Sequence, residues 1–168
     1  DALARVLPPD CKDRGAFKGL SEFKPSPIVS LHLWLDRKIL DVPFVGLIDT
    51  ELHWVFDREL VWGIPARAGH LVSLVVSGAD ELAAMDRAAV RDLCWADLIS
   101  ALPEARGATI LDWEVVKERS ATFRGRPGLS RHRFGPESPL PGLLVAGDWT
   151  DTGLPATMEG ACASGHAA

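Results

Sequence analysis

Hydrophobic and polar positions alternate with a period of two in the first half of the chain. From Leu31 to Leu35 every second position is leucine, so residues 28–35 predict a strand with one buried face. Residues 44–48 and 52–56 flank the turn residues 49–51 and predict a hairpin. Residues 71–76 are almost entirely apolar, which is typical of a strand covered on both faces. We expect these segments to share one sheet.

The hydrophobic period changes to three and four residues after Ser77. This pattern predicts a helix from Asp80 to Leu102, broken at Asp86, that packs one face on the sheet. Residues 110–117 predict a further strand, and residues 120–141, rich in glycine and proline, predict a long loop. Two charged groups are interpreted as solvated. They are Asp57, Arg58 and Glu59 at a strand end, and Arg124, Arg126, Arg131 and Arg133 in the loop.

The last segment predicts a strand, a loop and a helix in succession. Leu143–Ala146 is an apolar strand that leads into Gly147 and Asp148. Gly147 lets the backbone approach a ligand closely because it has no Cβ atom. Asp148 offers a carboxylate to the hydroxyl groups of a ribose or ribityl chain. The same succession of strand, turn and helix occurs in most α/β proteins, so the spacing alone leaves open a ligand site or an ordinary structural unit at the end of the strand.

The helix of this segment is predicted to begin at Pro155, because proline has a preset φ and lacks a donor that the first helical turn leaves unpaired anyway. The amides of Ala156, Thr157 and Met158 then face outward at the positive end of the helix dipole. Such an end suits an anion or a polarised carbonyl group.

Composition excludes several classes of protein. The chain has 168 residues, 47% hydrophobic and 24% charged, and fits one soluble globular domain. A net charge of −5 argues against a nucleic-acid partner, and no apolar run is long enough to span a membrane. Three dispersed cysteines favour a reducing compartment, so we expect a cytoplasmic location. The histidines lack metal-ligand spacing, and no GxSxG motif supports a hydrolase.

Residues 144–161 closely resemble the C-terminal flavin motif of the flavin amine oxidase and phytoene desaturase superfamily. Within it, the chain is most similar to the squalene-associated FAD-dependent desaturases, also described as hydroxysqualene dehydroxylases of hopanoid synthesis. Residues 26–37, 46–58 and 119–123 support this resemblance, which covers nearly the whole chain. The GxGxxG unit that begins the family's dinucleotide-binding fold is absent from the sequence. We therefore expect a C-terminal part of a longer enzyme that by itself binds FAD poorly and is inactive.

The resemblance implies an α/β fold with a mixed substrate-side sheet and a packed helix, followed by the last strand and helix of a Rossmann-like FAD domain. The expected segments are a linker at 1–24, the substrate-side sheet and helix at 25–122, a loop at 123–142 and the FAD-binding unit at 143–168. The implied cofactor site consists of Gly147, Asp148, Pro155, Ala156, Thr157 and Met158. The first two would hold the ribityl and pyrophosphate region, and the backbone at Thr157 and Met158 would approach the N1–C2=O edge of the flavin ring.

The implied reaction is reductive removal of the hydroxyl of hydroxysqualene. A phytoene-type desaturase or an amine oxidase is the alternative within the superfamily, and a non-enzymatic module that self-associates is the alternative of another class. The residues expected to line the substrate are His53, Trp54 and Trp34. No residue is assigned as catalytic acid or base. The implied partners are the isoprenoid substrate, the missing N-terminal part, the inner membrane leaflet through peripheral contact, and a second copy of the chain.

Overall fold

The computed structural model describes residues 2–9, 11, 15–63, 65 and 68–168. These residues form two compact units. The sheet unit comprises Pro27–Arg119, and the terminal unit comprises Asp1–Ser26 together with Ser120–Ala168. Two long strands, β1 (Pro25–Leu35) and β5 (Ile110–Phe123), belong to both units because each continues across a unit boundary. The α/β architecture expected from the sequence is confirmed.

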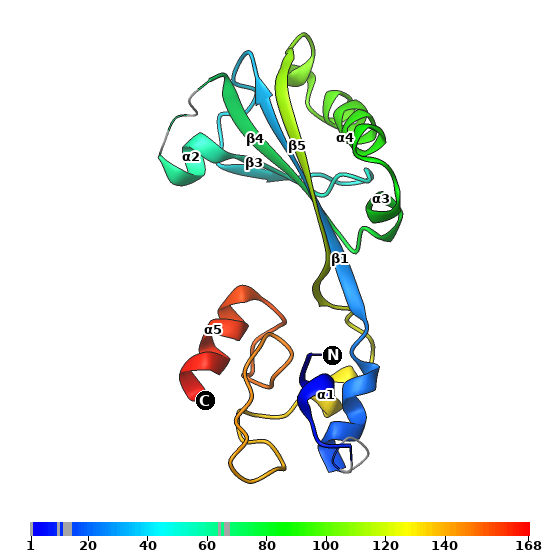
Figure 1. Ribbon diagram of the computed structural model, residues 1–168. Helices are drawn as coiled ribbons and strands as arrows, with labels where there is room; N and C mark the ends of the chain where they lie inside the picture. The colour runs from blue at the N-terminus through cyan, green and yellow to red at the C-terminus, as the bar shows by residue number, and fades with distance from the viewer. Residues whose placement is uncertain (1, 10, 12–14, 64, 66–67) are drawn as a thin grey trace. The chain divides into compact units, whose positions relative to one another are not determined.

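A five-stranded sheet occupies the described part of the sheet unit, in the order β2-β3-β4-β1-β5 (Figure 1). Strands β2 (Phe44–Gly46) and β3 (Trp54–Asp57) form the predicted hairpin, and β4 (His70–Ser77) lies antiparallel between β3 and β1. The amide of Asp36 donates to the carbonyl of Thr109 at 3.0 Å, and the amide of Arg124 donates to the carbonyl of Lys24 at the other end, so β5 runs antiparallel to β1. The sheet is therefore antiparallel, where a mixed sheet was expected.

One face of the sheet carries the hydrophobic core. On β1 the alternate residues Val29, Leu31, Leu33 and Leu35 are buried, as the period of two predicts. They pack with buried residues of α4 (Arg87–Ala101), which lies beside the sheet together with α3 (Asp80–Ala84) (Figure 1). The Asp86 carboxylate accepts from the amide of Ala89 at 2.9 Å and caps α4. The predicted helix break at Asp86 is confirmed.

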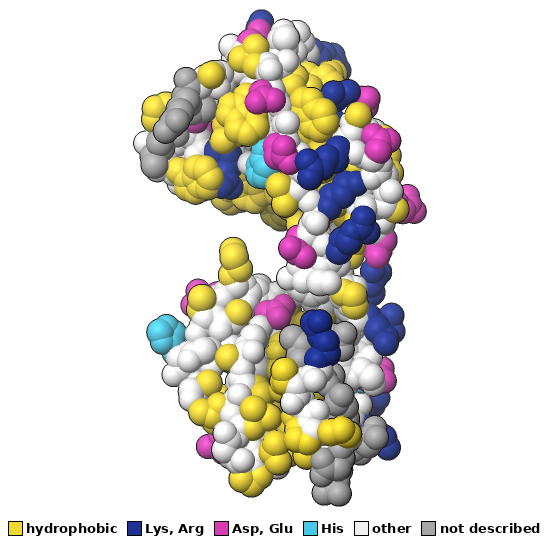
Figure 2. All heavy atoms as spheres, in the orientation of Figure 1, with side chains coloured by type: hydrophobic (Ala, Val, Ile, Leu, Met, Phe, Trp, Pro, Cys, Tyr) yellow, Lys and Arg dark blue, Asp and Glu magenta, His cyan; other side chains and the backbone are white. Residues whose placement is uncertain are grey.

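The opposite face of the sheet is aromatic and only partly covered. The rings of Phe44, Trp54 and Phe56 lie within 5.9 to 6.3 Å of one another, and Trp54 is 42% exposed. On β4 the residues Leu71 and Val75, which share this face, are half-buried. The expectation that residues 71–76 are covered on both faces is met only in part on this face, where Ser73 is buried but Leu71 and Val75 are not, and α3 and α4 pack on the other face. Figure 2 shows hydrophobic side chains gathered on the sheet unit.

Strand β5 extends six residues beyond the predicted end at Lys117, into the segment expected to be a loop. The extension follows from its neighbour, since β1 begins as early as Pro25 and the amide of Arg124 donates to the carbonyl of Lys24 at 2.8 Å. A short 3-10 helix, η3 (Leu129–His132), interrupts the remaining loop. Pairing with a distant strand, which local composition does not encode, decided this boundary.

The terminal unit is held together by a series of aromatic contacts. Its helical elements are α1 (Ala2–Val6), the 3-10 helix η1 (Gly15–Glu22), η3 and α5 (Met158–Ala167). Edge-to-face pairs join Phe17 to Phe134, Phe134 to Trp149, Trp149 to Phe23, and Phe23 to Phe123, with centroid distances of 5.1 to 5.9 Å. Each such pair contributes about 0.5–1.5 kcal/mol beyond its buried area. These rings bring the end of β5 beside the loop that follows residue 147.

The strand predicted at Leu143–Ala146 is not formed. Leu144 makes an isolated bridge with Glu137, and the amide of Val145 donates to the carbonyl of Pro136 at 2.9 Å. A strand requires a continuous ladder, and among the described residues this short stretch offers only that bridge. Its apolar composition therefore yields an extended segment with one buried residue, Val145.

Among the described residues, no helix combines the length and apolar character that crossing a membrane requires.

Candidate functional site

Gly147 opens a tight turn at the centre of the predicted site. Its φ is 144°, and a Cβ atom added there would lie 2.8 Å from Nε1 of Trp149. The fully buried Thr150 closes the turn, since its hydroxyl donates to the Gly147 carbonyl at 2.8 Å. The Gly147 amide donates to Oγ of Ser164, in α5, at 2.8 Å. The turn is thereby fixed to the helix that follows it.

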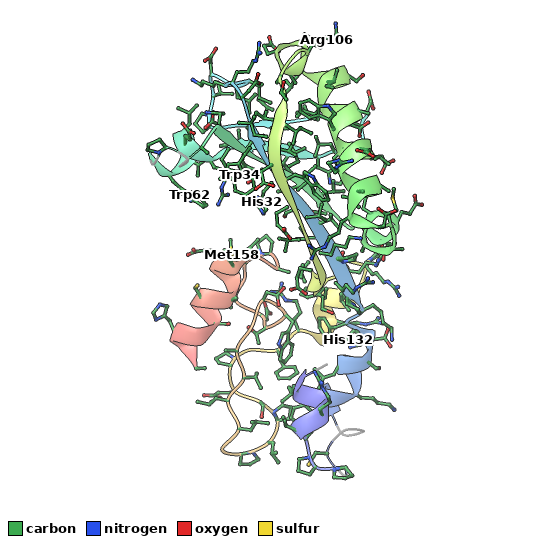
Figure 3. The ribbon with its side chains drawn as sticks, turned by 45° about the horizontal axis from the view of Figure 1, so that its top comes forward. His32, Trp34, Trp62, Arg106, His132 and Met158 are labelled. Atoms are coloured by element: carbon green, nitrogen blue, oxygen red, sulfur yellow. The ribbon has the colours of Figure 1, made fainter. Side chains whose placement is uncertain are left out.

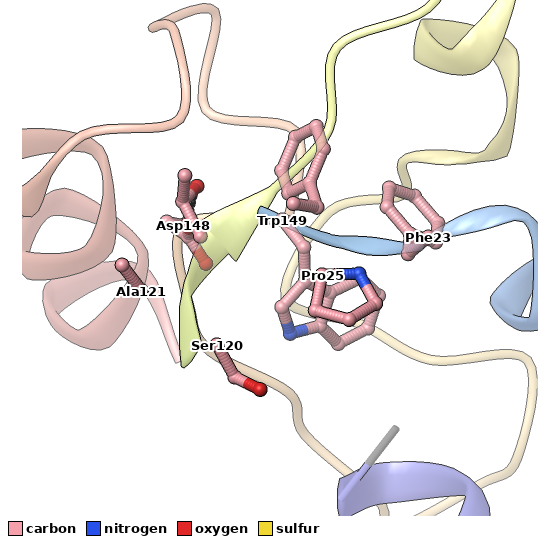
Figure 4. Close-up of a pocket in the computed structure, with 8 residues that line it drawn as sticks. Phe23, Pro25, Ser120, Ala121, Asp148 and Trp149 are labelled. Carbon is pink, nitrogen blue, oxygen red and sulfur yellow. Dashed lines mark hydrogen bonds between the residues drawn. The ribbon is translucent and has the colours of Figure 1, made fainter. Parts of the chain in front are cut away.

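Asp148 lies in the wall of a pocket of about 250 Å³ within the terminal unit (Figure 4). The pocket lies among Phe23, Trp149 and the end of β5. Oδ2 of Asp148 accepts from the hydroxyl of Thr122 at 2.6 Å. A carboxylate has about four acceptor sites on its two oxygens, so this bond does not exhaust its capacity to accept from a hydroxyl-bearing ligand.

Helix α5 begins at Met158, so Pro155 and Ala156 precede the helix and the predicted start at Pro155 is wrong. The reason is a local cap, because Oγ1 of Thr157 accepts from the amide of Gly160 at 3.1 Å. A Cβ atom on Gly160 would lie 2.7 Å from the carbonyl oxygen of Pro155, so the lack of a side chain permits this close approach.

The amino end of α5 remains open to solvent. The amides of Met158 and Glu159 lie in the first turn, where a helix supplies no acceptor. Met158 is 88% exposed, and Figure 3 shows it at the start of the helix. The amide of Gly160 is already capped by Thr157, and the outward direction predicted for the amides of Ala156, Thr157 and Met158 stays a prediction.

These features fit parts of a flavin. A carboxylate that can accept beyond its bond from Thr122 suits the hydroxyls of a ribityl chain, and an open helix amino end suits the polar edge of the ring system. The amide of Gly147 is bonded to Ser164 of α5, so the loop that carries Asp148 is connected directly to the helix.

Arg133 was predicted to lie in a solvated loop, and this prediction is wrong. The guanidinium donates to four backbone carbonyls of the segment after Gly147, and the side chain is half-buried. Its position among glycines and prolines gave no local signal of this contact.

The residues expected to line the substrate belong to the sheet unit. Trp54 and the half-buried Trp34 lie on its aromatic face, since the register places Trp34 opposite Leu71 and Trp54 opposite Val75. The third of these residues, His53, makes a hydrogen bond within the sheet unit, in which its Nδ1 accepts from the amide of Ser77 at 3.2 Å.

A polar group interrupts the aromatic face. Nδ1 of His32 lies 2.8 Å from Oγ of Ser73, and the guanidinium of Arg58 stacks 3.4 Å from the centroid of Trp62. Burial, and next the positive charge of Arg58, lower the pKa of His32 below its ordinary value of 6.5, with Glu114 opposing. Figure 3 shows His32, Trp34 and Trp62 on the same side of the sheet unit. His32 is therefore predominantly neutral at pH 7.

Asp57 is wholly buried, so its interpretation as part of a solvated strand end is wrong. Its Oδ2 lies 2.7 Å from Nε2 of His70, and its Oδ1 accepts from the amide of Leu60 at 2.9 Å. Asp57 thereby caps α2 (Arg58–Trp62), and its two contacts engage both carboxylate oxygens. Within the described ranges, no three His, Cys, Asp or Glu side chains converge as a metal site requires.

The sequence profile of the family described as flavin containing amine oxidoreductase matches residues 2–168. The chain belongs to this family. Membership confirms the superfamily predicted from the residues around Gly147, a family described as flavin containing.

Two curated relatives are similar along nearly the whole chain. A hydroxysqualene dehydroxylase from Sinorhizobium fredii is 32% identical over 172 residues, which cover 100% of this chain and 37% of the relative. A chloroplastic/chromoplastic 15-cis-phytoene desaturase from Solanum lycopersicum is 27% identical over 181 residues, which cover 98% of this chain and 30% of the relative. The chain thus spans about a third of the length of these relatives.

A solved structure shares the fold. The crystal structure of an oxidoreductase from Methanosarcina mazei has a TM-score of 0.66 at 19% identity, and the match covers 96% of this chain and 37% of that chain. At this identity the likeness shows the fold alone.

Proposed function

We propose that this chain supplies the substrate-side sheet and part of the flavin site of an FAD-dependent oxidoreductase that acts on a long isoprenoid. The reaction that we favour is conversion of hydroxysqualene to squalene. The observation that carries the proposal is 32% identity to a hydroxysqualene dehydroxylase in a match that covers 100% of the chain, and the loop that offers Asp148 and the open end of α5 add to it.

The flavin site would be formed by the six residues predicted from the sequence. The carboxylate of Asp148 would accept hydrogen bonds from ribityl hydroxyls. Gly147 has no side chain, so the backbone there would approach the cofactor closely. The exposed segment from Pro155 to Met158 would bind the polar edge of the ring through backbone groups, with the helix dipole favouring negative charge there by about 0.3–1 kcal/mol. This free energy is enough to adjust the redox potential of a bound flavin but too small to account for its binding, so tight binding requires further protein groups.

The proposed reaction breaks one C–O bond and forms one C–H bond. The substrate carbon accepts a hydride, and the oxygen leaves as water after taking a proton. Reduced FAD supplies the hydride when it is bound, and a separate two-electron donor must restore its reduced state. The contribution of this chain is to bind and orient the cofactor and to present apolar surface to the substrate.

The aromatic face of the sheet suits a prenyl chain. Phe44, Trp54 and Phe56 form a contiguous, partly exposed group, and burial of apolar surface stabilises a bound ligand by about 25 cal/mol per Å². Trp34 belongs to the same face. Because such a substrate is insoluble in water, we also propose peripheral contact of the complete enzyme with the inner leaflet of the membrane.

A phytoene-type desaturase is the second candidate, favoured by the 27% identity to the tomato 15-cis-phytoene desaturase over 98% of the chain. This reaction runs in the opposite direction, since the substrate loses two hydrogens and an acceptor is reduced. The same cofactor site serves both directions, so the loop geometry does not separate them.

The test uses the longest open reading frame that encodes this chain, purified beside the chain alone. We expect the longer protein to copurify with flavin absorption that Asp148→Ala abolishes, and the chain alone to be colourless. Anaerobic incubation with hydroxysqualene and dithionite should then yield squalene, whereas phytoene with a quinone acceptor should yield no desaturated product. Desaturation alone would favour the second candidate. A colourless longer protein would contradict both and favour a non-enzymatic interaction module.

A further inference from the structure

Arg133 is bonded to the backbone of the turn that carries Asp148. Its Nε donates to the carbonyl of Trp149 at 3.2 Å, and its Nη1 donates to that of Leu154 at 3.0 Å. Its Nη2 donates to the carbonyls of Asp148 and Thr150, at 3.2 and 2.5 Å. All three guanidinium nitrogens thus donate to one loop, residues 148–154.

Arginine is the side chain that offers this pattern of donors. The guanidinium is planar and presents donors from three nitrogens in a fixed fork, whereas the ammonium of lysine is a compact point charge on a flexible stem. The four acceptors are dipolar backbone carbonyls, and none of them is a carboxylate. The contact therefore depends on geometry rather than on neutralisation of charge.

The main chain and the side chain of Asp148 are held by different partners. Nη2 of Arg133 donates to its carbonyl, while Thr122 donates to Oδ2 of its carboxylate. The next residue, Trp149, accepts from Nε of Arg133 and packs its ring on Phe134 and Phe23. With its carbonyl and its carboxylate both restrained, Asp148 is oriented before any ligand arrives.

We propose that Arg133 is a positioning residue of the flavin site, which holds the 148–154 loop in the conformation that presents Asp148 to the cofactor. This inference rests on the proposed function and names a residue that acts through the loop. A loop fixed beforehand binds a ligand more tightly because less conformational entropy is lost on binding.

The test compares Arg133→Lys and Arg133→Gln with Arg131→Lys and Arg131→Gln in the longest open reading frame. Arg131 is a matched control, because it lies two positions away, is exposed, and donates through Nε to its neighbour His132. We expect both Arg133 variants to weaken FAD affinity roughly tenfold or more, and both controls to retain it within about twofold. At saturating FAD, the flavin bound to the Arg133 variants should show a shifted visible absorption band.

Circular dichroism at the assay temperature separates positioning from loss of fold. The lysine variant keeps the charge and the stem, so it should fold while still failing to restore FAD affinity. Unchanged affinity and absorption in a folded Arg133→Lys variant would overturn the inference, as would a loss of flavin only in proportion to the unfolded fraction. A colourless wild-type protein would instead overturn the proposed function itself.

Discussion

The hydroxyl of Thr122 donates to Oδ2 of Asp148 across 2.6 Å and joins the end of β5 to the loop that follows Gly147. The two residues are 26 positions apart in sequence. The bond exists because β5 continues beyond its predicted end, which brings Thr122 beside the pocket. The extended strand and the candidate cofactor loop are therefore parts of one arrangement.

We expect Thr122→Val to lower the free energy of unfolding of the terminal unit by about 1–3 kcal/mol, since the half-buried Asp148 carboxylate would lose this donor. Thr152→Val is the control, because its hydroxyl accepts only a long contact of 3.4 Å from the amide of Leu154. Thermal unfolding of both variants measures the difference. An equal loss of stability in the two variants would contradict a specific stabilising contribution of the bond between Thr122 and Asp148.

Gly147→Ala should destabilise the protein by about 1–3 kcal/mol, because L residues rarely adopt a φ of 144° and the added Cβ would lie 2.8 Å from the Trp149 ring. Gly165→Ala should have the opposite effect on stability. Gly165 lies in α5 with nothing within 4 Å of the position that a Cβ atom would take, so alanine should stabilise that helix by about 0.5–1 kcal/mol. Urea unfolding checks both signs, and a stable Gly147→Ala protein would contradict the assigned turn.

Cys94 and Cys162 should differ sharply in reactivity. Burial, and next the charge of Asp97, raise the pKa of the Cys94 thiol to about 11, whereas Cys162 is exposed. At pH 8 a maleimide should therefore modify Cys162 and spare Cys94 until the protein is unfolded. Mass spectrometry of the labelled peptides reports the outcome, and rapid native labelling of Cys94 would contradict its burial on the face of α4 that packs in the core.

Asp36 should make stability depend on acid pH. Hydrogen bonds from Arg37 and then from the Thr109 amide lower its pKa from 3.8 to about 2. Because the folded-state pKa is depressed, this contribution is complete above pH 3.8 and is lost as pH falls toward 2. Asp36→Asn should flatten the dependence of unfolding temperature on pH within that window. An unchanged slope in the variant would assign the dependence to other carboxylates.

Local sequence was sufficient for elements whose partners lie nearby. The period of two along residues 28–35 identified the buried face of β1, and Asp86 marked the break before α4 because a capping carboxylate acts within three residues. The local sequence did not predict the structure at positions where contacts with residues far away along the chain determine it. Residues 143–146 have the composition of a strand but pair only at Leu144 among the residues that the structure describes, and Asp57 is buried because His70 and the start of α2 surround its carboxylate.

The sequence by itself indicated the family, because the resemblance to its C-terminal flavin motif lies in one continuous stretch, residues 144–161. The same stretch led to the prediction that Gly147 and Asp148 contact the cofactor. Only the tertiary structure decided that α5 begins at Met158, that Thr122 bonds to Asp148 and that Arg133 holds the loop. The last two contacts join residues that are 26 and 15 positions apart, and the aromatic packing of the terminal unit holds these segments side by side, so the local sequence around either partner does not encode them.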